Sequence, residues 1–201
     1  LDLTTLQVDF TQKLVPEVRE EYFKGKGFDN IAAQFCVHYF LENENTIRNV
    51  YNIIVDHLKP GGHIILTTLN GDRVLKYLNV ERRVKEGEIA TIYREGSVVF
   101  AIKRLYSSEM LQDYGQQIGV YVESIGGEHR EFLVNFKYLI NLFTSEKKLE
   151  LVYKKDFEDI YKEGVDSIRS GKKFNKSMLM SDAEKTYSFL NSLLVFKRTK
   201  N

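Results

Sequence analysis

An amide, an aromatic ring, an imidazole and a phenol lie close together in the segment Gln34-Phe35-Cys36-Val37-His38-Tyr39. The apolar residues that lead into it predict a buried strand over residues 30–36. In open α/β sheets, ligands bind beyond the carboxyl ends of the strands. We therefore expect this segment to line a pocket, with His38 and Tyr39 at the end of the strand. The alternative for His38 is a structural histidine whose ring is satisfied inside the protein.

An alternation of strands and helices surrounds this segment. Residues 3–8 and 63–69 have the composition of strands. Residues 11–23 and 45–58 are expected to be helical, and the second of these segments has apolar side chains at the 3.6-residue period. The order strand, helix, strand, helix, strand predicts a parallel α/β sheet.

The pattern changes between residues 81 and 128, where short strand-like pieces are separated by turns that contain glycine and serine. This composition predicts an antiparallel insertion, with Gly126-Gly127 as its exit. The strands expected within it are residues 89–93, 98–103 and 119–125. The elements expected after it are a helix at residues 132–143, a strand at 149–153, a helix that begins with the capping box Ser181-x-x-Glu184, and a strand at 193–197.

The composition is that of a globular protein. A chain of 201 residues with 43% hydrophobic and 12% aromatic residues is long enough to bury a sizeable core. The 29 basic and 28 acidic residues give a formal net charge of +1, so an RNA would have to be held by a local basic patch. The single cysteine fits a reducing compartment, and no apolar run approaches the ~20 residues that span a bilayer. We expect a soluble, intracellular protein.

Three segments occur together in one order: FDNIAAQFCVHYFLENENTIRNVYNIIVDHLKPGGHIILTTLNGD, EFLVNF and LELVYKKDFEDIY. Through them the chain resembles the mRNA cap guanine-N7 methyltransferases, especially those of large cytoplasmic DNA viruses. The resemblance covers most of the chain from Phe28 to Lys197. It implies an α/β fold, a Rossmann-like class I methyltransferase sheet with an antiparallel insertion. Residues 1–201 would be the C-terminal portion of one methyltransferase domain, with the insertion at about residues 81–128.

The resemblance also implies which residues bind the guanine of the cap. Glu131, expected at the start of the helix after the insertion, would read the base, because a carboxylate matches the adjacent N1–H and N2 amino donors of guanine. The alternative is an acidic residue that only complements a helix dipole. His38 and Tyr39 would border the base. Tyr121 lies near an aromatic cap contact of the family, although core packing explains it almost as well. Asn191 stands near a position where many members carry a tyrosine; its amide could still hydrogen-bond the cap, although it cannot stack in the same way.

A second group of residues is implied for the methyl donor, S-adenosylmethionine. Asp9 and Phe10 would meet the adenine, and Gln34 and Phe35 would contact the donor from the next strand. An ordinary strand-end turn is the alternative for Asp9. The glycine-rich motif of methyltransferases is missing, so we expect these 201 residues alone to lack half of the donor site.

The predicted function is the transfer of a methyl group from S-adenosylmethionine to N7 of the guanine cap of RNA. Guanine N7 carries a lone pair and no proton, so we predict no catalytic base, and no metal either; alignment of the reacting atoms would carry catalysis. One alternative is a non-catalytic methyltransferase-like subunit or cap-binding module, which the missing motif favours if the natural chain starts at Leu1. Another is a small-molecule methyltransferase, because Leu58-Lys59-Pro60-Gly61-Gly62 is a widespread motif.

The implied partners are the capped 5′ end of RNA and a guanylyltransferase, either on the same polypeptide or on a partner subunit, and no membrane. A viral member would act in the cytoplasm, in a viral factory or in the virion, and a cellular member would act in the nucleus.

Overall fold

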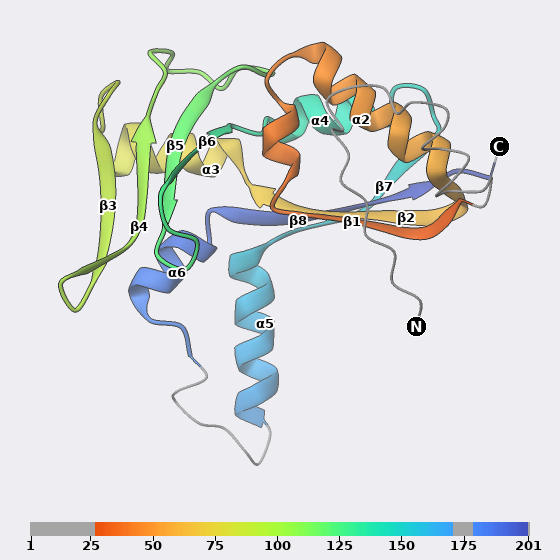
Figure 1. Ribbon diagram of the computed structural model, residues 1–201. Coiled ribbons are helices and arrows are strands. Elements are labelled where there is room, and N and C mark those ends of the chain that lie inside the picture. The colour runs from red at the N-terminus through yellow and green to blue at the C-terminus, as the bar shows by residue number, and fades with distance from the viewer. Residues whose placement is uncertain (1–26, 171–178, 201) are drawn as a thin grey trace.

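The computed structural model describes residues 27–170 and 179–200, which form two four-stranded sheets that lie next to each other (Figure 1). The strand and the helix expected at residues 3–8 and 11–23 lie outside the described residues, as do Asp9 and Phe10. No helix in the described ranges is long and apolar enough to cross a membrane.

The first sheet has the strand order β1 (Phe28–Gln34), β2 (Leu58–Leu69), β8 (Asn191–Arg198) and β7 (Leu149–Asp156). Strands β1 and β2 are parallel, whereas β8 is antiparallel to both β2 and β7. Helices α2 (Glu44–His57) and α4 (Phe136–Thr144) cover one face of this sheet and build the larger core with it (Figure 1). The parallel pair of β1 and β2 confirms part of the predicted parallel sheet, whereas β8 runs in the opposite direction.

Strand β1 differs from the expected buried strand at residues 30–36. Its residues are exposed or half-buried, and it ends at Gln34. The physical reason is its place at the edge of the sheet, since only β2 pairs with it among the described residues. The apolar composition predicted the strand correctly but not the exposure of its two faces.

Helix α2 confirms the helix expected at residues 45–58. Asn43 is its N-cap, and Asn43 and Thr46 form a reciprocal capping box. Its apolar side chains lie on one buried stripe, as the 3.6-residue period requires. The chain enters the helix through η1 (Val37–Phe40), a turn of 3₁₀ helix that carries His38 and Tyr39.

The second sheet has the order β3 (Ile89–Arg94), β4 (Ser97–Arg104), β5 (Gln117–Val122) and β6 (Glu128–Phe132), and all neighbours are antiparallel. Three of these strands confirm the antiparallel strands predicted there. The fourth, β6, was not predicted. Gly126 and Gly127, with φ values of +71° and +70°, lie between β5 and β6 and are not the exit from the sheet.

The placement of Glu131 on a helix was therefore wrong. Glu131 lies on β6, and the next helix, α4, begins only after its N-cap, Asn135. The apolar pair Phe132-Leu133 fits the end of a strand as well as the start of a helical stripe, and this ambiguity extended the predicted helix backwards.

One face of the second sheet is buried against helical segments. Helix α3 (Gly71–Lys76), the π-helical turn η2 (Tyr77–Glu81) and helix α6 (Asp182–Ser188) form a second core with it. The predicted capping box is present at the start of α6, where Ser181 and Glu184 cap each other. Helix α5 (Phe157–Ser170) projects away from both sheets (Figure 1).

Polar contacts attach helix α3 to the first sheet where β2 and β8 meet. The Asn70 side chain donates to the Ser192 hydroxyl at 3.2 Å, and Ser192 donates to Asp156 at 2.5 Å. Asp156 also pairs with Arg73 of α3 at 2.7 Å. Helix α3, which packs in the core of the second sheet, is thus attached to the end of the first sheet where β2 and β7 terminate.

Candidate functional site

The structure brings His38 of η1 and Glu131 of β6 together, although they are far apart in the sequence. His38 Nε2 and Glu131 Oε1 are 3.6 Å apart. Both residues are buried, with exposed fractions of 4% for His38 and 8% for Glu131. The pair lies where the carboxyl end of β1 approaches the edge strand of the second sheet. This is the region predicted to form a pocket wall.

Burial keeps the two side chains from forming a salt bridge near neutral pH. It lowers the pKa of His38 to about 4, so the imidazole is neutral. It also raises the pKa of Glu131 to about 7, so the carboxyl group changes charge in the physiological range. A buried carboxyl group poised in this way is typical of a functional site.

The imidazole of His38 has an unused hydrogen-bonding position. Its Nδ1 lies 3.5 Å from the Thr68 hydroxyl, whereas Nε2 has no hydrogen-bond partner among the described residues. Buried polar atoms are normally paired, because an unpaired one costs about 1–3 kcal/mol. Nε2 points toward Glu131, and a ligand that binds beside the pair could contact both groups.

Tyr39 places an aromatic ring at the same site. The centroids of the His38 and Tyr39 rings are 4.2 Å apart, with an angle of 67° between the ring planes. Tyr39 is 44% exposed, and burial, followed by the charge of Glu131, raises the pKa of its phenol. The ring therefore combines contact with the buried pair and a surface on which a planar ligand can pack.

Gln34 and Phe35 lie at the carboxyl end of β1. The Gln34 side-chain oxygen accepts a hydrogen bond from the Thr67 hydroxyl at 2.5 Å. Phe35 adopts a left-handed backbone, with a φ of +51°, that is uncommon for a bulky residue. Its ring is exposed and meets the edge of the Phe157 ring at a centroid distance of 6.1 Å. The strained turn directs an aromatic ring outward at the end of the strand.

Tyr121 is not brought to this pair, and the amide nitrogen of Asn191 is engaged with backbone carbonyls. Tyr121 is paired with Glu128 across β5 and β6, whereas Glu131 is paired with Ile118, so Tyr121 and Glu131 lie on opposite faces of the sheet. Asn191 is buried at the start of β8, where its amide nitrogen donates to the Tyr187 and Ser188 carbonyl oxygens, each at 3.2 Å. In the structure, the Asn191 amide group serves to cap α6.

Tyr187 was missed by the sequence reasoning. Burial, followed by the charge of Glu131, raises the pKa of its phenol, so its hydroxyl lies within electrostatic reach of that carboxyl group. Its ring is 4.1 Å from that of Phe100, with an angle of 34° between the planes. The available signal was its position one helical turn before Asn191, on the helix that leads into β8.

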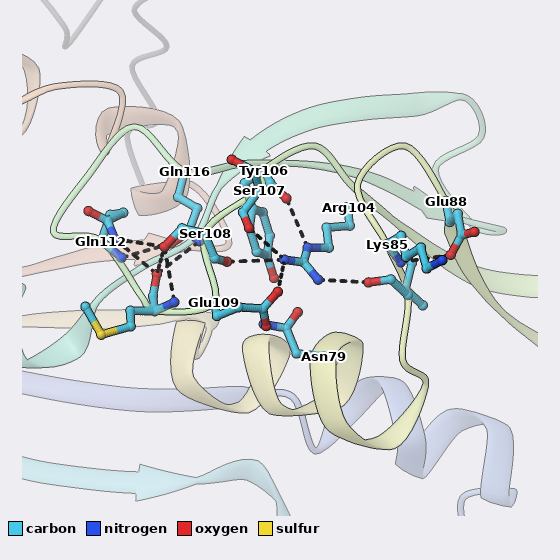
Figure 2. Close-up of polar contacts among 12 residues, drawn as sticks. Asn79, Lys85, Glu88, Arg104, Tyr106, Ser107, Ser108, Glu109, Gln112 and Gln116 are labelled. Carbon is cyan, nitrogen blue, oxygen red and sulfur yellow. Dashed lines mark hydrogen bonds and ion pairs between the residues drawn. The ribbon is translucent and has the colours of Figure 1, made fainter.

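Arg104 organises the loop that supports both halves of the site. Figure 2 shows its buried guanidinium surrounded by oxygen atoms. The group donates to the carbonyl oxygens of four residues at distances of 2.9–3.3 Å and to the Glu109 carboxylate at 2.9 Å. The four carbonyl groups belong to Val84, Tyr106, Ser107 and Ser108.

The loop held by Arg104, residues 105–116, contacts both site elements through its backbone. The Gly115 N–H donates to the Leu41 carbonyl just after η1, at 2.7 Å. The Gln116 carbonyl accepts from the Leu133 N–H just after β6, at 2.8 Å. The loop thus connects the segment that carries His38 to the strand that carries Glu131.

Comparisons with known proteins show which family the chain resembles. Residues 3–192 match the family described as the mRNA (guanine-N(7))-methyltransferase domain. The chain is 31% identical over 179 residues to the mRNA-capping enzyme of African swine fever virus, covering 88% of this chain and 20% of that protein. It is 30% identical over 155 residues to the mRNA cap guanine-N(7) methyltransferase of Cryptococcus neoformans, covering 77% of this chain and 24% of that protein. The chain thus spans about a fifth to a quarter of the length of these relatives.

The fold is also similar to that of a solved S-adenosylmethionine-dependent methyltransferase from Clostridium acetobutylicum. The TM-score is 0.50 at 13% sequence identity, and the match covers 96% of this chain and 63% of the other. This likeness confirms the predicted fold class, a Rossmann-like class I methyltransferase sheet with an antiparallel insertion. The family match and the relatives show that the chain belongs to the mRNA (guanine-N(7))-methyltransferase domain family.

Proposed function

We propose that the polypeptide containing this chain transfers a methyl group from S-adenosylmethionine to N7 of the guanine cap of RNA, and that this chain is the C-terminal portion of the methyltransferase domain. The observation that carries the proposal is the buried pair of Glu131 and His38 beside the exposed ring of Tyr39. The family match supports the same reading.

The chemistry of the pair suits guanine. The ionised Glu131 carboxylate offers two acceptor oxygens to the N1–H and N2 amino donors of the base. The Thr68 hydroxyl can donate to His38 Nδ1, which leaves Nε2 to carry the proton and to donate toward guanine O6. The Tyr39 ring can pack on the plane of the base. Tyr187 adds a second aromatic residue near Glu131.

Residues at the end of β1 fit the methyl donor. The outward ring of Phe35 offers a surface for an adenine ring, and Gln34 keeps its amide N–H groups as donors while its oxygen is held by Thr67. Asp9 and Phe10 are proposed for the adenine on the resemblance alone. S-adenosylmethionine would supply an activated methyl group on a sulfonium. Guanine N7 needs no deprotonation, so the residues of this chain bind and orient the substrate rather than remove a proton.

The capped 5′ end of RNA is the proposed substrate. The relative from African swine fever virus is an mRNA-capping enzyme that is much longer than this chain. This supports the proposal that a guanylyltransferase lies on the same polypeptide or on a partner subunit. The proposed location is the cytoplasm, in a viral factory or virion, for a viral protein and the nucleus for a cellular one.

Methyl transfer can be tested directly on the full-length polypeptide. It would be incubated with S-adenosylmethionine labelled in the methyl group and with RNA that carries an unmethylated guanine cap. We expect the label in N7-methylguanosine after nuclease digestion. Cap binding without transfer by the full-length protein would contradict the proposal and favour a non-catalytic cap-binding module.

Tyr39→Ala is expected to lower kcat/KM for capped RNA at least about tenfold, or 1.4 kcal/mol, because the base loses its packing surface. The melting temperature should change little, since Tyr39 is largely exposed. Tyr153→Ala is the matched control, because Tyr153 of β7 is also 44% exposed but lies on the other sheet edge. Equal activity of the two variants would remove Tyr39 from the site.

The activity is expected to depend on the ionisation of Glu131. Because burial raises the pKa of Glu131 to about 7, kcat/KM should rise as the pH increases through about 7 and level off above it. The ionised form accepts from both guanine donors, whereas the protonated form presents a donor to them. Steady-state rates from pH 5.5 to 8.5 would reveal the inflection, and Glu131→Gln should remove it. An inflection that persists in the variant would assign the titration to another group.

A further inference from the structure

None of the described residues covers one face of the second sheet. Its inner face is buried against α3, η2 and α6, whereas its outer face surrounds a shallow hollow of about 390 Å³. Tyr93, Lys103, Tyr121 and Glu128 are among the residues that line the hollow. Its floor is Gly119, where the space that a Cβ would need is taken by the Glu128 side chain.

Aromatic rings stand on this outer face. Tyr93 of β3 is 62% exposed, and Tyr121 of β5 is half-buried. Both border the same hollow from different strands. Aromatic side chains on the open face of an antiparallel sheet are a recurrent platform for the bases of single-stranded nucleic acid, because every base has a face that can stack.

Two cations flank the floor of the hollow. Lys103 of β4 and Arg130 of β6 are both paired with Gly119, one from each side, so their Cα atoms are roughly 10 Å apart, or two strand spacings. Neither has an acidic partner within ion-pair distance in the described ranges, whereas Arg94 and Arg104 of the same sheet do. The two cations outnumber the single carboxylate of Glu128 in this group, so the face suits phosphate groups.

Strand β6 connects this face to the candidate cap site. Its side chains alternate between the two faces of the sheet, so Glu131 points inward to His38 while its neighbour Arg130 lies on the outer face. Because β6 is an edge strand among the described residues, an RNA chain that extends from a cap bound at Glu131 reaches the outer face by passing one strand.

We propose that the outer face of the second sheet binds the single-stranded RNA that follows the cap. Bases stack on Tyr93 and Tyr121, and Lys103 and Arg130 contact phosphates. Ile89, Val98 and Ala101 also line the hollow and can contact the faces of bases. A protein partner would favour an apolar patch without free charge, whereas Lys103 and Arg130 stand here without an ion-pair partner in the described ranges, which favours a phosphate backbone. The inference rests on the proposed function for the origin of the RNA, but binding to the face can be measured without methyl transfer.

Binding of a fluorescent, uncapped 12-nucleotide RNA to the full-length polypeptide, followed by anisotropy at several salt concentrations, tests the surface. The double variant Lys103→Gln, Arg130→Gln should lower the slope of log K against log salt by about 1.4, because each lost phosphate contact contributes about 0.7 for single strands. Tyr93→Ala should weaken binding at least about fivefold. The matched controls Lys148→Gln, in the turn before β7, and Tyr153→Ala, on β7, should bind as the wild type does.

Methylation assays separate this surface from the cap site. In the double variant, KM should rise about tenfold for a long capped RNA and stay unchanged for a capped dinucleotide, which is too short to reach the outer face. An unchanged salt slope would overturn the proposal and leave the face to a protein partner. An equal loss on the dinucleotide would also overturn it, because the variant would then act through the cap site. If no methyl transfer occurs at all, the proposed function fails while the anisotropy result still decides the surface.

Discussion

Glu131→Gln is expected to lower kcat/KM for capped RNA by about 30-fold to nearly 1000-fold, which corresponds to on the order of 2 to 4 kcal/mol. The substitution keeps the shape of the side chain but replaces one acceptor oxygen with an amino group. That group would face a guanine donor in a site where Glu131 is almost completely buried. The expected loss in kcat/KM therefore has two causes. The charge-assisted hydrogen bond to guanine is missing, and two hydrogen-bond donors face each other.

An altered cap can show that the lost interaction is the one with guanine. Inosine keeps N1–H and lacks the N2 amino group, so an inosine cap should be a poorer substrate for the wild type. In Glu131→Gln this penalty should shrink, because the two changes remove the same interaction. Glu123→Gln is a suitable control, since Glu123 forms a surface ion pair with Arg94. If Glu131→Gln retains wild-type rates, or if the two penalties simply add, Glu131 does not read the base.

Arg104→Met is expected to lower the free energy of unfolding by about 3 kcal/mol or more. The guanidinium is buried and satisfies four carbonyl groups, and removal of such a charged donor leaves these groups without partners. Methionine replaces the apolar stem but none of the donors. Urea unfolding of the full-length polypeptide, followed by a probe in this domain, measures the change.

Two further variants show which part of the Arg104 network matters. Glu109→Gln removes only a carboxylate that is 74% exposed at its side chain, so it should cost less than about 1 kcal/mol. Arg104→Lys keeps the charge but cannot reach all four carbonyl groups, so it should lie between Glu109→Gln and Arg104→Met. If Arg104→Met and Glu109→Gln are equally mild, the guanidinium does not hold the loop.

The parts of the fold that local patterns determine could be predicted from the sequence. Helix α2 has both the apolar period and the Asn43 cap, and the start of α6 has its capping box, so each element is specified by neighbouring residues. The exposure of β1 could not be predicted, because it depends on which strands pair on either side and not on its composition. The sequence did not show that Glu131 lies on a strand, because the adjacent Phe132-Leu133 fits both the period of a strand and that of a helix.

The same distinction holds for the candidate site. His38 and Glu131 were identified through the resemblance, and the structure places them 3.6 Å apart. The separation of Tyr121 from Glu131 follows from strand register, which requires the unpredicted hairpin of β5 and β6. Arg104 carries no local signal of its role, since it acts through contacts with distant segments, and the only signal for Tyr187 was its position one helical turn before Asn191.

The hairpin formed by β5 and β6 constrains how the length of this chain can vary. Deletion or insertion of one residue between Gly127 and Glu131 would shift the register of β6 by one and exchange the faces of all its side chains. Arg130 or Phe132 would then stand beside His38, and the negative charge of the buried pair would be lost or reversed. Length changes in pairs preserve the faces. Homologous hairpins of this family should therefore differ in length by even numbers at this place, whatever the sequence of the turn.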